Sequence, residues 1–157
     1  MDINRAIQLI VMLCMRFEGV YLLPYLCPAG VPTIGVGCTR YEDGTLVTLK
    51  DPAITRERAT QLLLFKIKTE FLPAVLKLCP ELDTPESVAA ITDLCFNIGT
   101  GNLKTSTLRK KINARDWDAV PAQIRKWVRA AGKVLKGLVL RREAEIILWL
   151  FSRNVRN

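Results

Sequence analysis

The sequence predicts an α+β fold that is mostly α, with a small β-containing N-terminal lobe and an all-helical C-terminal lobe. Glycines and prolines concentrate between positions 24 and 37, which favours short strands and turns there, whereas apolar residues recur at helical spacing over most of the remaining chain. With 157 residues, half of them apolar, the chain can bury a core without disulfides or bound metal. We expect a single domain with an N-terminal lobe of about residues 1–60, a connecting helix over about 55–79 and a helical lobe over about 80–157.

The first predicted helix runs from about Ile3 to Arg16. Its apolar residues return every three or four positions, at Ile3, Ile7, Ile10, Leu13 and Phe17. Glu18 therefore lies at the C-terminal end of this helix, where the helix dipole has its negative pole. Phe17 and Val20 reduce the solvation of the carboxylate as well, and both effects favour the protonated form that a general acid needs.

A short strand is predicted next, over Thr33 to Thr39. Strand alternation divides its residues into a core face with Ile34, Val36 and Cys38 and a second face with Thr33, Gly35, Gly37 and Thr39. Bare glycines on an exposed face would let a flat ligand such as a sugar ring approach the backbone, with Thr33 at the edge of this floor. The alternative is that the glycines only allow tight strand packing.

The rest of the chain is predicted to be helical. A long helix begins at the N-cap Thr55 and continues to about Leu78, with a kink at Pro73. A second helix begins at Thr84-Pro85 and ends at Gly99. Three further helices are expected over Ser106 to Ile112, Asp116 to Ala130 and Leu138 to Phe151. The three tryptophans are expected to anchor the core, at Trp117, Trp127 and Trp149.

The sequence contains no histidine, which excludes Ser-His-Asp and Cys-His catalysis and the common catalytic zinc sites. Its five cysteines are odd in number and form no Cys-x-x-Cys pair: Cys14, Cys27, Cys38, Cys79 and Cys95. This pattern predicts neither a metal site nor a complete disulfide framework. We therefore expect free thiols made in a reducing compartment, and no cofactor.

Positive charge is concentrated in the last third of the chain. Residues 1–103 carry 9 Lys and Arg against 11 Asp and Glu, whereas residues 104–157 carry 14 against 4. A surface of this kind attracts polyanions, namely nucleic acid, anionic lipid or an acidic wall polymer, and charge alone does not choose among them. A solvated basic face that only keeps the protein in solution is an equally good interpretation.

No segment is predicted to enter or span a membrane. The apolar stretch from Ala6 to Met15 has about half of the roughly 20 residues that a bilayer requires, and Gln8 interrupts it. Only Arg5 precedes this stretch, and no small-x-small cleavage site follows it before Glu18. We therefore expect neither a signal peptide nor a signal anchor.

The most informative motif is Glu18-x8-Cys27-x5-Thr33, within the segment FEGVYLLPYLCPAGVPTIGVGCT. It resembles the catalytic signature of the phage-type lysozymes, the endolysins of glycoside hydrolase family 24. Two later segments, FNIGTGNLKTSTLRKKIN at 96–113 and KGLVLRREAE at 136–145, resemble the C-terminal lobe of the same family. Because the three motifs occur in the same order as in the family, the resemblance implies a lysozyme-like fold of two lobes joined by a long helix.

The resemblance implies a muramidase that hydrolyses the β-1,4 bond between N-acetylmuramic acid and N-acetylglucosamine in bacterial peptidoglycan, causing lysis of the host. Glu18 is then the general acid that protonates the leaving oxygen. The family has Asp or Cys at the second position, so Cys27 assists the attacking water or stabilises positive charge, while Thr33 orients the water. A free thiol with a pKa of about 8.5 is mostly protonated at neutral pH, so Cys27 needs a site that lowers its pKa.

Residue-by-residue resemblance also places Thr39, Phe96 and Thr107 along the saccharide cleft, although Phe96 fits the core equally well. The chain departs from the family at two positions, where Cys38 stands in place of a common His and Leu140 in place of a common Asn. Cys38 is expected to cost a supporting hydrogen bond near Glu18, and Leu140 puts a polar contact of the C-terminal lobe in doubt. The activity is therefore expected to be lower than the motif suggests.

Two other functions remain open. A lytic transglycosylase uses one Glu as acid and then as base, while the 6-hydroxyl of the sugar attacks, and the motif contains no second carboxylate. A non-enzymatic alternative is a cationic protein that binds membranes or nucleic acid through its basic C-terminal third.

The muramidase interpretation also predicts the binding partners of the protein and its location in the cell. The partner is bacterial peptidoglycan, with no nucleic acid and no membrane insertion, and the protein acts as a monomer. It stays in the host cytoplasm after synthesis and acts on the cell wall or periplasm after release. Because no export signal is expected, release requires a holin, which the resemblance implies.

Overall fold

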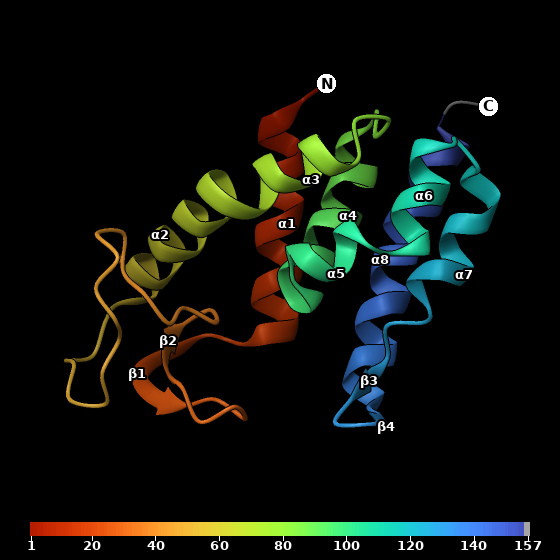
Figure 1. Cartoon of the computed structure of the whole chain (residues 1–157). Helices are drawn as coiled ribbons and strands as arrows, with labels where there is room; N and C mark the ends of the chain where they lie inside the picture. Colours follow the sequence, from red (N-terminus) through yellow and green to blue (C-terminus); the bar gives the residue numbers. More distant parts are fainter. Residues whose placement is uncertain (156–157) are drawn as a thin grey trace. The chain divides into compact units, whose positions relative to one another are not determined.

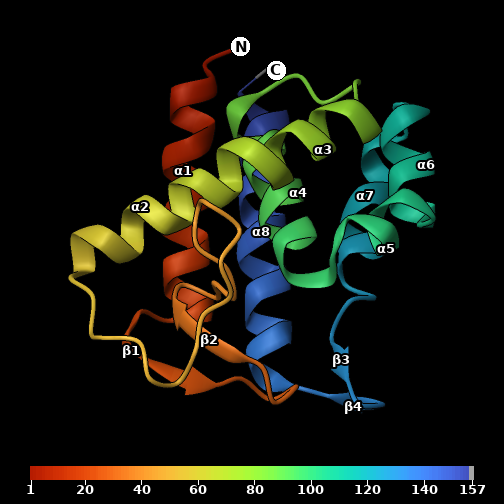
Figure 2. The same ribbon diagram turned by 60° about the vertical axis from the view of Figure 1, so that its left-hand side comes forward.

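The structure is a computed structural model that describes residues 1–155 and is mostly helical (Figures 1 and 2). Two small antiparallel sheets, each of two strands, accompany the helices in the described chain. The predicted class, α+β and mostly α, is therefore confirmed. Within these residues no helix is both long enough and apolar enough to cross a membrane.

The chain forms two compact units. Residues Val11–Glu70 make one unit, and Met1–Ile10 together with Phe71–Asn157 make the other. Helix α1 (Ile3–Glu18) contributes to both. The first ten residues, which the sequence assigned to the N-terminal lobe, thus group with the C-terminal part of the chain, and the single-domain organisation stays a prediction.

In the unit of Val11–Glu70, α1 is followed by strand β1 (Tyr21–Leu26), strand β2 (Pro32–Gly35) and helix α2 (Arg56–Lys66). The helix predicted from the first apolar stripe is confirmed, and Glu18 is its last residue. Strands β1 and β2 pair as an antiparallel hairpin with a register shift inside β1. Ile34, Cys38, Val47 and Leu62 form a buried apolar cluster of this unit.

The strand predicted over Thr33 to Thr39 is only half as long as expected. It ends at Gly35, and a turn at Val36 and Gly37 folds the chain back so that the backbones of Ile34 and Cys38 exchange two hydrogen bonds, of 2.8 and 3.0 Å. The bare glycine floor is also wrong at Gly35. Gly35 is buried against Ala59 of α2, where a Cβ would be in ordinary contact at 3.6 Å, and its φ of +67° is a left-handed conformation that favours glycine.

The long helix predicted from Thr55 is interrupted before Pro73. Thr55 caps α2 as expected by accepting a hydrogen bond from the backbone of Arg58, but a π-helical turn, η1 (Ile67–Phe71), separates α2 from α3 (Leu72–Leu78). Pro73 has no N–H for the carbonyl of Thr69, and its ring crowds that carbonyl in an α-helix. A wider turn placed just before the proline relieves this conflict without ending the helix.

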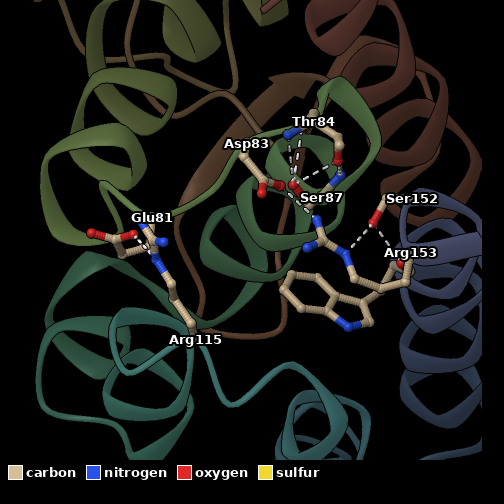
Figure 3. A network of polar contacts seen from close by, with 8 residues as sticks. Glu81, Asp83, Thr84, Ser87, Arg115, Ser152 and Arg153 are labelled. Carbon is tan, nitrogen blue, oxygen red and sulfur yellow. Dashed lines mark hydrogen bonds and ion pairs between the residues drawn. The ribbon is translucent and has the colours of Figure 1, made fainter. Parts of the chain in front are cut away.

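The second unit is built around α4 (Pro85–Ile98) and α8 (Lys136–Asn154), which lie side by side in Figures 1 and 2. Thr84 is the N-cap of α4 and Gly99 is its C-cap, in agreement with the predicted start and end. Thr84 and Ser87 cap each other at its start, and this network appears in Figure 3. The same view shows the ion pair of Arg153 with Asp83, at 2.6 Å, which fastens the end of α8 beside the start of α4.

Smaller elements surround these two helices. They are α5 (Thr100–Lys104), α6 (Thr107–Asn113), the 3₁₀ turn η2 (Trp117–Ala119), α7 (Val120–Ile124), β3 (Arg129–Ala130) and β4 (Lys133–Val134). Ser106 caps α6, in agreement with the sequence. Of the predicted tryptophan anchors only Trp149 is fully buried, while Trp117 and Trp127 are half-buried.

The helix predicted over Asp116 to Ala130 is wrong in its second half. It ends at Ile124, and β3 and β4 form a hairpin instead. Ala131 and Gly132 between them both have positive φ, at 50° and 76°. Two such residues make the two-residue turn that joins twisted antiparallel strands, a geometry that the helical pattern does not reveal.

Buried charges join α4 to α8. Arg141 donates two hydrogen bonds of 2.9 Å to Asp93, and Arg142 donates one of 2.7 Å to Glu145. Burial raises the pKa of Glu145 well above its ordinary value, and a hydrogen bond with Asp93 adds to this effect. The two helices are therefore held together by an ionic cluster that has no access to bulk water.

Replacing one member of this cluster tests its contribution to stability. We expect Asp93→Ala to lower the free energy of unfolding by about 3–5 kcal/mol, because Arg141 is left buried without a carboxylate. The measurement is chemical denaturation followed by circular dichroism. The matched control is Glu143→Ala, which breaks the exposed pair with Arg125 and is expected to cost at most about 1 kcal/mol. Equal losses in both variants would contradict the role of the cluster.

Candidate active site

Glu18 is placed by the end of α1. Gly19 follows it with a φ of +75°, its N–H bonds to the carbonyl of Met15 at 3.2 Å, and the chain then turns into β1. A Cβ at position 19 would lie 3.2 Å from the ring of Tyr21, so a side chain there would disturb both the turn and the tyrosine. The predicted position of Glu18 at a helix C-terminus is confirmed.

Cys27 opens the loop that joins β1 to β2. Its carbonyl accepts a hydrogen bond from the N–H of Gly30 at 2.8 Å, and its own N–H donates to the carbonyl of Val31 at 3.1 Å. These bonds close a tight turn in which Pro28 presets the backbone. Both the N–H and the carbonyl of Cys27 are therefore hydrogen-bonded within the loop.

Thr33 lies on β2 opposite Tyr25 of β1, and it is almost fully buried, with 2 % of its surface exposed. Its hydroxyl donates to the carbonyl of Val31 at 2.8 Å. The expectation that Thr33 stands at the edge of an exposed floor is therefore wrong, because the residue is packed inside the hairpin unit. Its hydroxyl is still close to the cysteine, because it is among the groups that lower the pKa of the Cys27 thiol.

The surroundings of Cys27 favour its thiolate. A backbone hydrogen bond from Val31 lowers the pKa of the thiol most; partial burial opposes this, and the backbone of Ala29 and the hydroxyl of Thr33 lower the pKa further. Each of these groups stabilises negative charge on sulfur. The sequence left open whether the site would lower the pKa of Cys27, and it does so without a basic side chain.

Tyr25 is electrostatically coupled to both the acid and the thiol. Burial raises the pKa of its phenol, and the negative charges of Tyr21, Glu18 and Cys27 add to this rise. Its ring also stacks on that of Tyr21, with centroids 4.2 Å apart. Glu18 and Cys27 therefore act on one and the same side chain, which connects the helix end to the hairpin loop.

Sequence reasoning does not single out Tyr25. The available signal is its place two residues before Cys27 in a strand that follows Glu18 directly. Strand alternation puts position 25 on the face of position 33 once the pairing register is known, but the bulge in β1 hides that register from the sequence.

Thr39, the predicted cleft residue that belongs to this unit, is half-buried and lines a hollow of about 360 Å³ with Tyr41, Phe65 and Lys66. The residues that line this hollow do not include any member of the triplet. The structure therefore gives Thr39 access to a cavity, and its role in binding saccharide stays a prediction.

Phe96 and Thr107 belong to the other unit. Phe96 is half-buried, and its ring packs against Phe71 with centroids 4.9 Å apart, as the core interpretation of this residue expects. Thr107 is exposed at the start of α6 and lines a small hollow of about 210 Å³ beside Lys126 and Trp127. Neither role in binding saccharide is tested by these contacts.

The structure can be compared with known proteins at this point. The family model described as phage lysozyme matches residues 15–145, which is most of the chain and includes Glu18, Cys27 and Thr33. The chain belongs to the phage lysozyme family. It is therefore an enzyme of the lysozyme type, and the resemblance indicated by the three ordered motifs is confirmed.

Individual members of this family are similar over most of their lengths. The SAR-endolysin of Enterobacteria phage P21 is 35% identical over 84% of this chain and 78% of its own. The endolysin of Acyrthosiphon pisum secondary endosymbiont phage 1 is 36% identical over 87% of this chain and 92% of its own. Among solved structures, the endolysin from Escherichia coli O157:H7 phage FAHEc1 superposes with a TM-score of 0.82 and 31% identity, covering 97% of this chain and 95% of that one.

The two departures from the phage lysozyme pattern have different environments. Cys38 is buried in the apolar cluster with Ile34 and Leu62, and burial raises the pKa of its thiol, so it packs there as an uncharged side chain. Leu140 is exposed on α8. The structure thus gives Cys38 a place in the core and leaves Leu140 without a buried partner.

The reactivity of Cys27 can be measured directly, because the other four cysteines are buried and all five are free thiols. We expect an alkylating reagent to label Cys27 first, with a pH midpoint below that of an ordinary thiol. Since the folded protein lowers the pKa, the thiolate appears at lower pH than in the unfolded chain and persists at all higher pH values. Labelling rates against pH, with mass spectrometry to locate the site, provide the measurement.

Thr33→Val supplies the matched variant, since it keeps the shape and removes the hydroxyl. In this variant the pH midpoint of Cys27 labelling is expected to move upward, toward that of a free thiol. Cys27→Ser is the control for labelling at other positions. If Cys27 of the unmodified protein were labelled with a pH midpoint at or above that of a free thiol, the lowering of its pKa by the backbone of Val31 would be contradicted.

Proposed function

We propose that this phage lysozyme is an endolysin that hydrolyses the β-1,4 bond between N-acetylmuramic acid and N-acetylglucosamine in bacterial peptidoglycan. One observation carries the proposal: the fold lowers the pKa of Cys27, and both Cys27 and Glu18 lie close enough to Tyr25 to raise its pKa, within one compact unit. A proton donor and a negatively charged group are the two functions that glycoside hydrolysis needs.

In the proposed reaction Glu18 gives its proton to the oxygen of the leaving N-acetylglucosamine as the bond from that oxygen to C1 of N-acetylmuramic acid breaks. Positive charge then develops at C1. A water molecule forms the new bond to C1, and the thiolate of Cys27 accepts its proton or stabilises the positive charge. The products are two glycan chains, one with a new reducing end.

Thr33 fits a positioning role for the water and the sulfur. Its single hydroxyl proton has two acceptors within reach, the carbonyl of Val31 and the sulfur of Cys27. Burial and the bond to Val31 restrict the hydroxyl to few orientations, which lowers the entropy cost of aligning a water beside it.

Hydrolysis fits the site better than transglycosylation does. A lytic transglycosylase that relies on Glu18 alone makes no use of a second ionisable group. The hairpin loop nevertheless directs the backbone of Val31 and Ala29 and the hydroxyl of Thr33 at the sulfur of Cys27. This arrangement supports a chemical role for the thiolate in addition to packing.

The names of the relatives support the biological setting. The relatives from phage P21 and from the Acyrthosiphon pisum endosymbiont phage are named as endolysins, and this chain spans most of the length of each. We infer that the substrate is wall peptidoglycan and that lysis of the host is the outcome. Release from the cytoplasm through a holin, action as a monomer and the absence of a nucleic-acid partner belong to the same proposal.

Loss of the acid tests the enzymatic role. We expect Glu18→Gln to lower the rate of clearing of a peptidoglycan suspension by about 10²–10⁴-fold, because the amide cannot donate a proton to the leaving oxygen. The measurement is turbidity with time. Glu57→Gln, an exposed Glu in the first turn of α2, is the matched control and is expected to clear at the unmodified rate. Clearing that survives Glu18→Gln unchanged would refute the proposed acid.

The chemistry of the products separates hydrolysis from transglycosylation. We expect the muropeptides released by the unmodified enzyme to carry reducing ends, since water is the attacking group. Reduction with borohydride followed by mass spectrometry detects these ends. Muropeptides ending in 1,6-anhydro sugars would show that the 6-hydroxyl attacks, and the transglycosylase alternative would replace the proposed reaction.

A further inference from the structure

Helix α8 has an unusual distribution of side chains. It buries the charged or polar residues Arg141, Arg142, Glu145 and Ser152 beside Ile146 and Trp149, yet it leaves several large apolar side chains exposed. The exposed apolar residues of the helix and its end are Val139, Leu140, Ile147, Leu150, Phe151 and Val155. A helix on the surface of a soluble domain normally turns its apolar side inward.

The buried polar side chains of α8 bind other groups of the protein. Arg141 and Arg142 bind Asp93 and Glu145, and at the other end Arg153 binds Asp83 while the hydroxyl of Ser152 donates to a backbone carbonyl (Figure 3). Rotation of the helix would break these contacts. The outward direction of the apolar side is therefore fixed by the ionic contacts underneath.

The exposed apolar residues form a continuous stripe. Leu140, Ile147 and Phe151 are spaced by seven and four positions, which places them on one side of an α-helix. Ile147 is 68% exposed and Phe151 is 50% exposed. The acid nearest this stripe, Glu143, is neutralised by Arg125 at 2.9 Å. From Val139 to Phe151 of α8 the stripe has a length of about 18 Å.

Cations lie at the N-terminal end of the stripe. Arg129 and Lys133 of the β3–β4 hairpin and Lys136 at the start of α8 are all exposed, and none forms an ion pair with a carboxylate in the described chain. Val134 and Leu135, between the two lysines, are exposed apolar residues. Apolar and cationic side chains thus alternate where the hairpin meets the helix.

This combination selects one kind of partner. A nucleic acid or an acidic wall polymer would be bound by the cations alone and would leave six apolar side chains in water. A second copy of the chain would bring together two molecules of net charge +8, which repel each other. An anionic bilayer surface offers phosphate groups to the cations and acyl chains to the stripe.

We propose that the α8 stripe and the β3–β4 hairpin bind the surface of anionic phospholipid membranes, with α8 lying in the plane of the headgroups. The apolar side chains enter the boundary between headgroups and acyl chains, while Arg129, Lys133 and Lys136 contact lipid phosphates. The protein lies on the bilayer and does not span it. This surface uses none of the residues of the proposed catalytic triplet, so it goes beyond the proposed function and does not depend on it.

Vesicle sedimentation with the full chain tests the proposal. We expect the chain to sediment with phosphatidylcholine vesicles that contain phosphatidylglycerol, to stay in solution with pure phosphatidylcholine, and to be released by high salt. The double variant Ile147→Gln/Phe151→Gln is expected to weaken binding by about tenfold or more, because the buried apolar area is lost. Lys133→Gln/Lys136→Gln is expected to weaken it as well, and mainly at low salt.

The matched control is Met12→Gln/Leu49→Gln, which removes two exposed apolar side chains elsewhere in the chain and is expected to leave vesicle binding unchanged. All variants should keep the circular dichroism spectrum and the rate of clearing of lipid-free peptidoglycan. Equal binding to neutral vesicles, or binding unaffected by both the stripe and the lysine variants, would overturn the proposal. So would a concentration-dependent dimer in ultracentrifugation that the Ile147→Gln/Phe151→Gln variant abolishes while vesicles remain unbound.

Discussion

The candidate active site depends on the backbone of a residue that carries no functional side chain. The carbonyl of Val31 accepts hydrogen bonds from the N–H of Cys27 and from the hydroxyl of Thr33, at 3.1 and 2.8 Å. A backbone hydrogen bond from Val31 is also the largest influence on the pKa of Cys27. One peptide segment in a tight hairpin loop therefore holds the backbone of Cys27, lowers the pKa of its thiol and directs the neighbouring hydroxyl.

Two local features place Glu18 near this loop, namely the end of α1 at Gly19 and the pairing of β1 with β2. Gly19 ends α1 directly after Glu18 and leads into β1, and Tyr25 of β1 lies opposite Thr33 on β2. The raised pKa of Tyr25, caused first by burial and then by its negative neighbours, shows that Glu18 and Cys27 act on a common environment. In the absence of histidine, the pKa of this thiol is lowered mainly by hydrogen bonds from the backbone of Val31 and Ala29 and from the hydroxyl of Thr33.

In the other unit, helices α4 and α8 pack together although α8 directs four charged or polar residues inward. Asp93 and Glu145 meet Arg141 and Arg142 in the interior, so each of these charges has an oppositely charged partner. The same arrangement leaves Leu140, Ile147 and Phe151 of α8 exposed. The internal ionic cluster and the exposed stripe are therefore two results of one helix orientation.

The sequence by itself determined the features that depend on local signals. Thr55, Thr84 and Ser106 were identified as helix starts and Gly99 as a helix end, and the spacing of Glu18, Cys27 and Thr33 identified the lysozyme family. Only the tertiary structure decided that Gly35 lies against α2 and that Ala131 and Gly132 form the turn of a hairpin. It also decided that a backbone hydrogen bond from Val31 lowers the pKa of Cys27. Helix caps and motif spacings depend only on the order of residues along the chain. Packing partners, pairing register and pKa depend on groups that only the folded chain brings together.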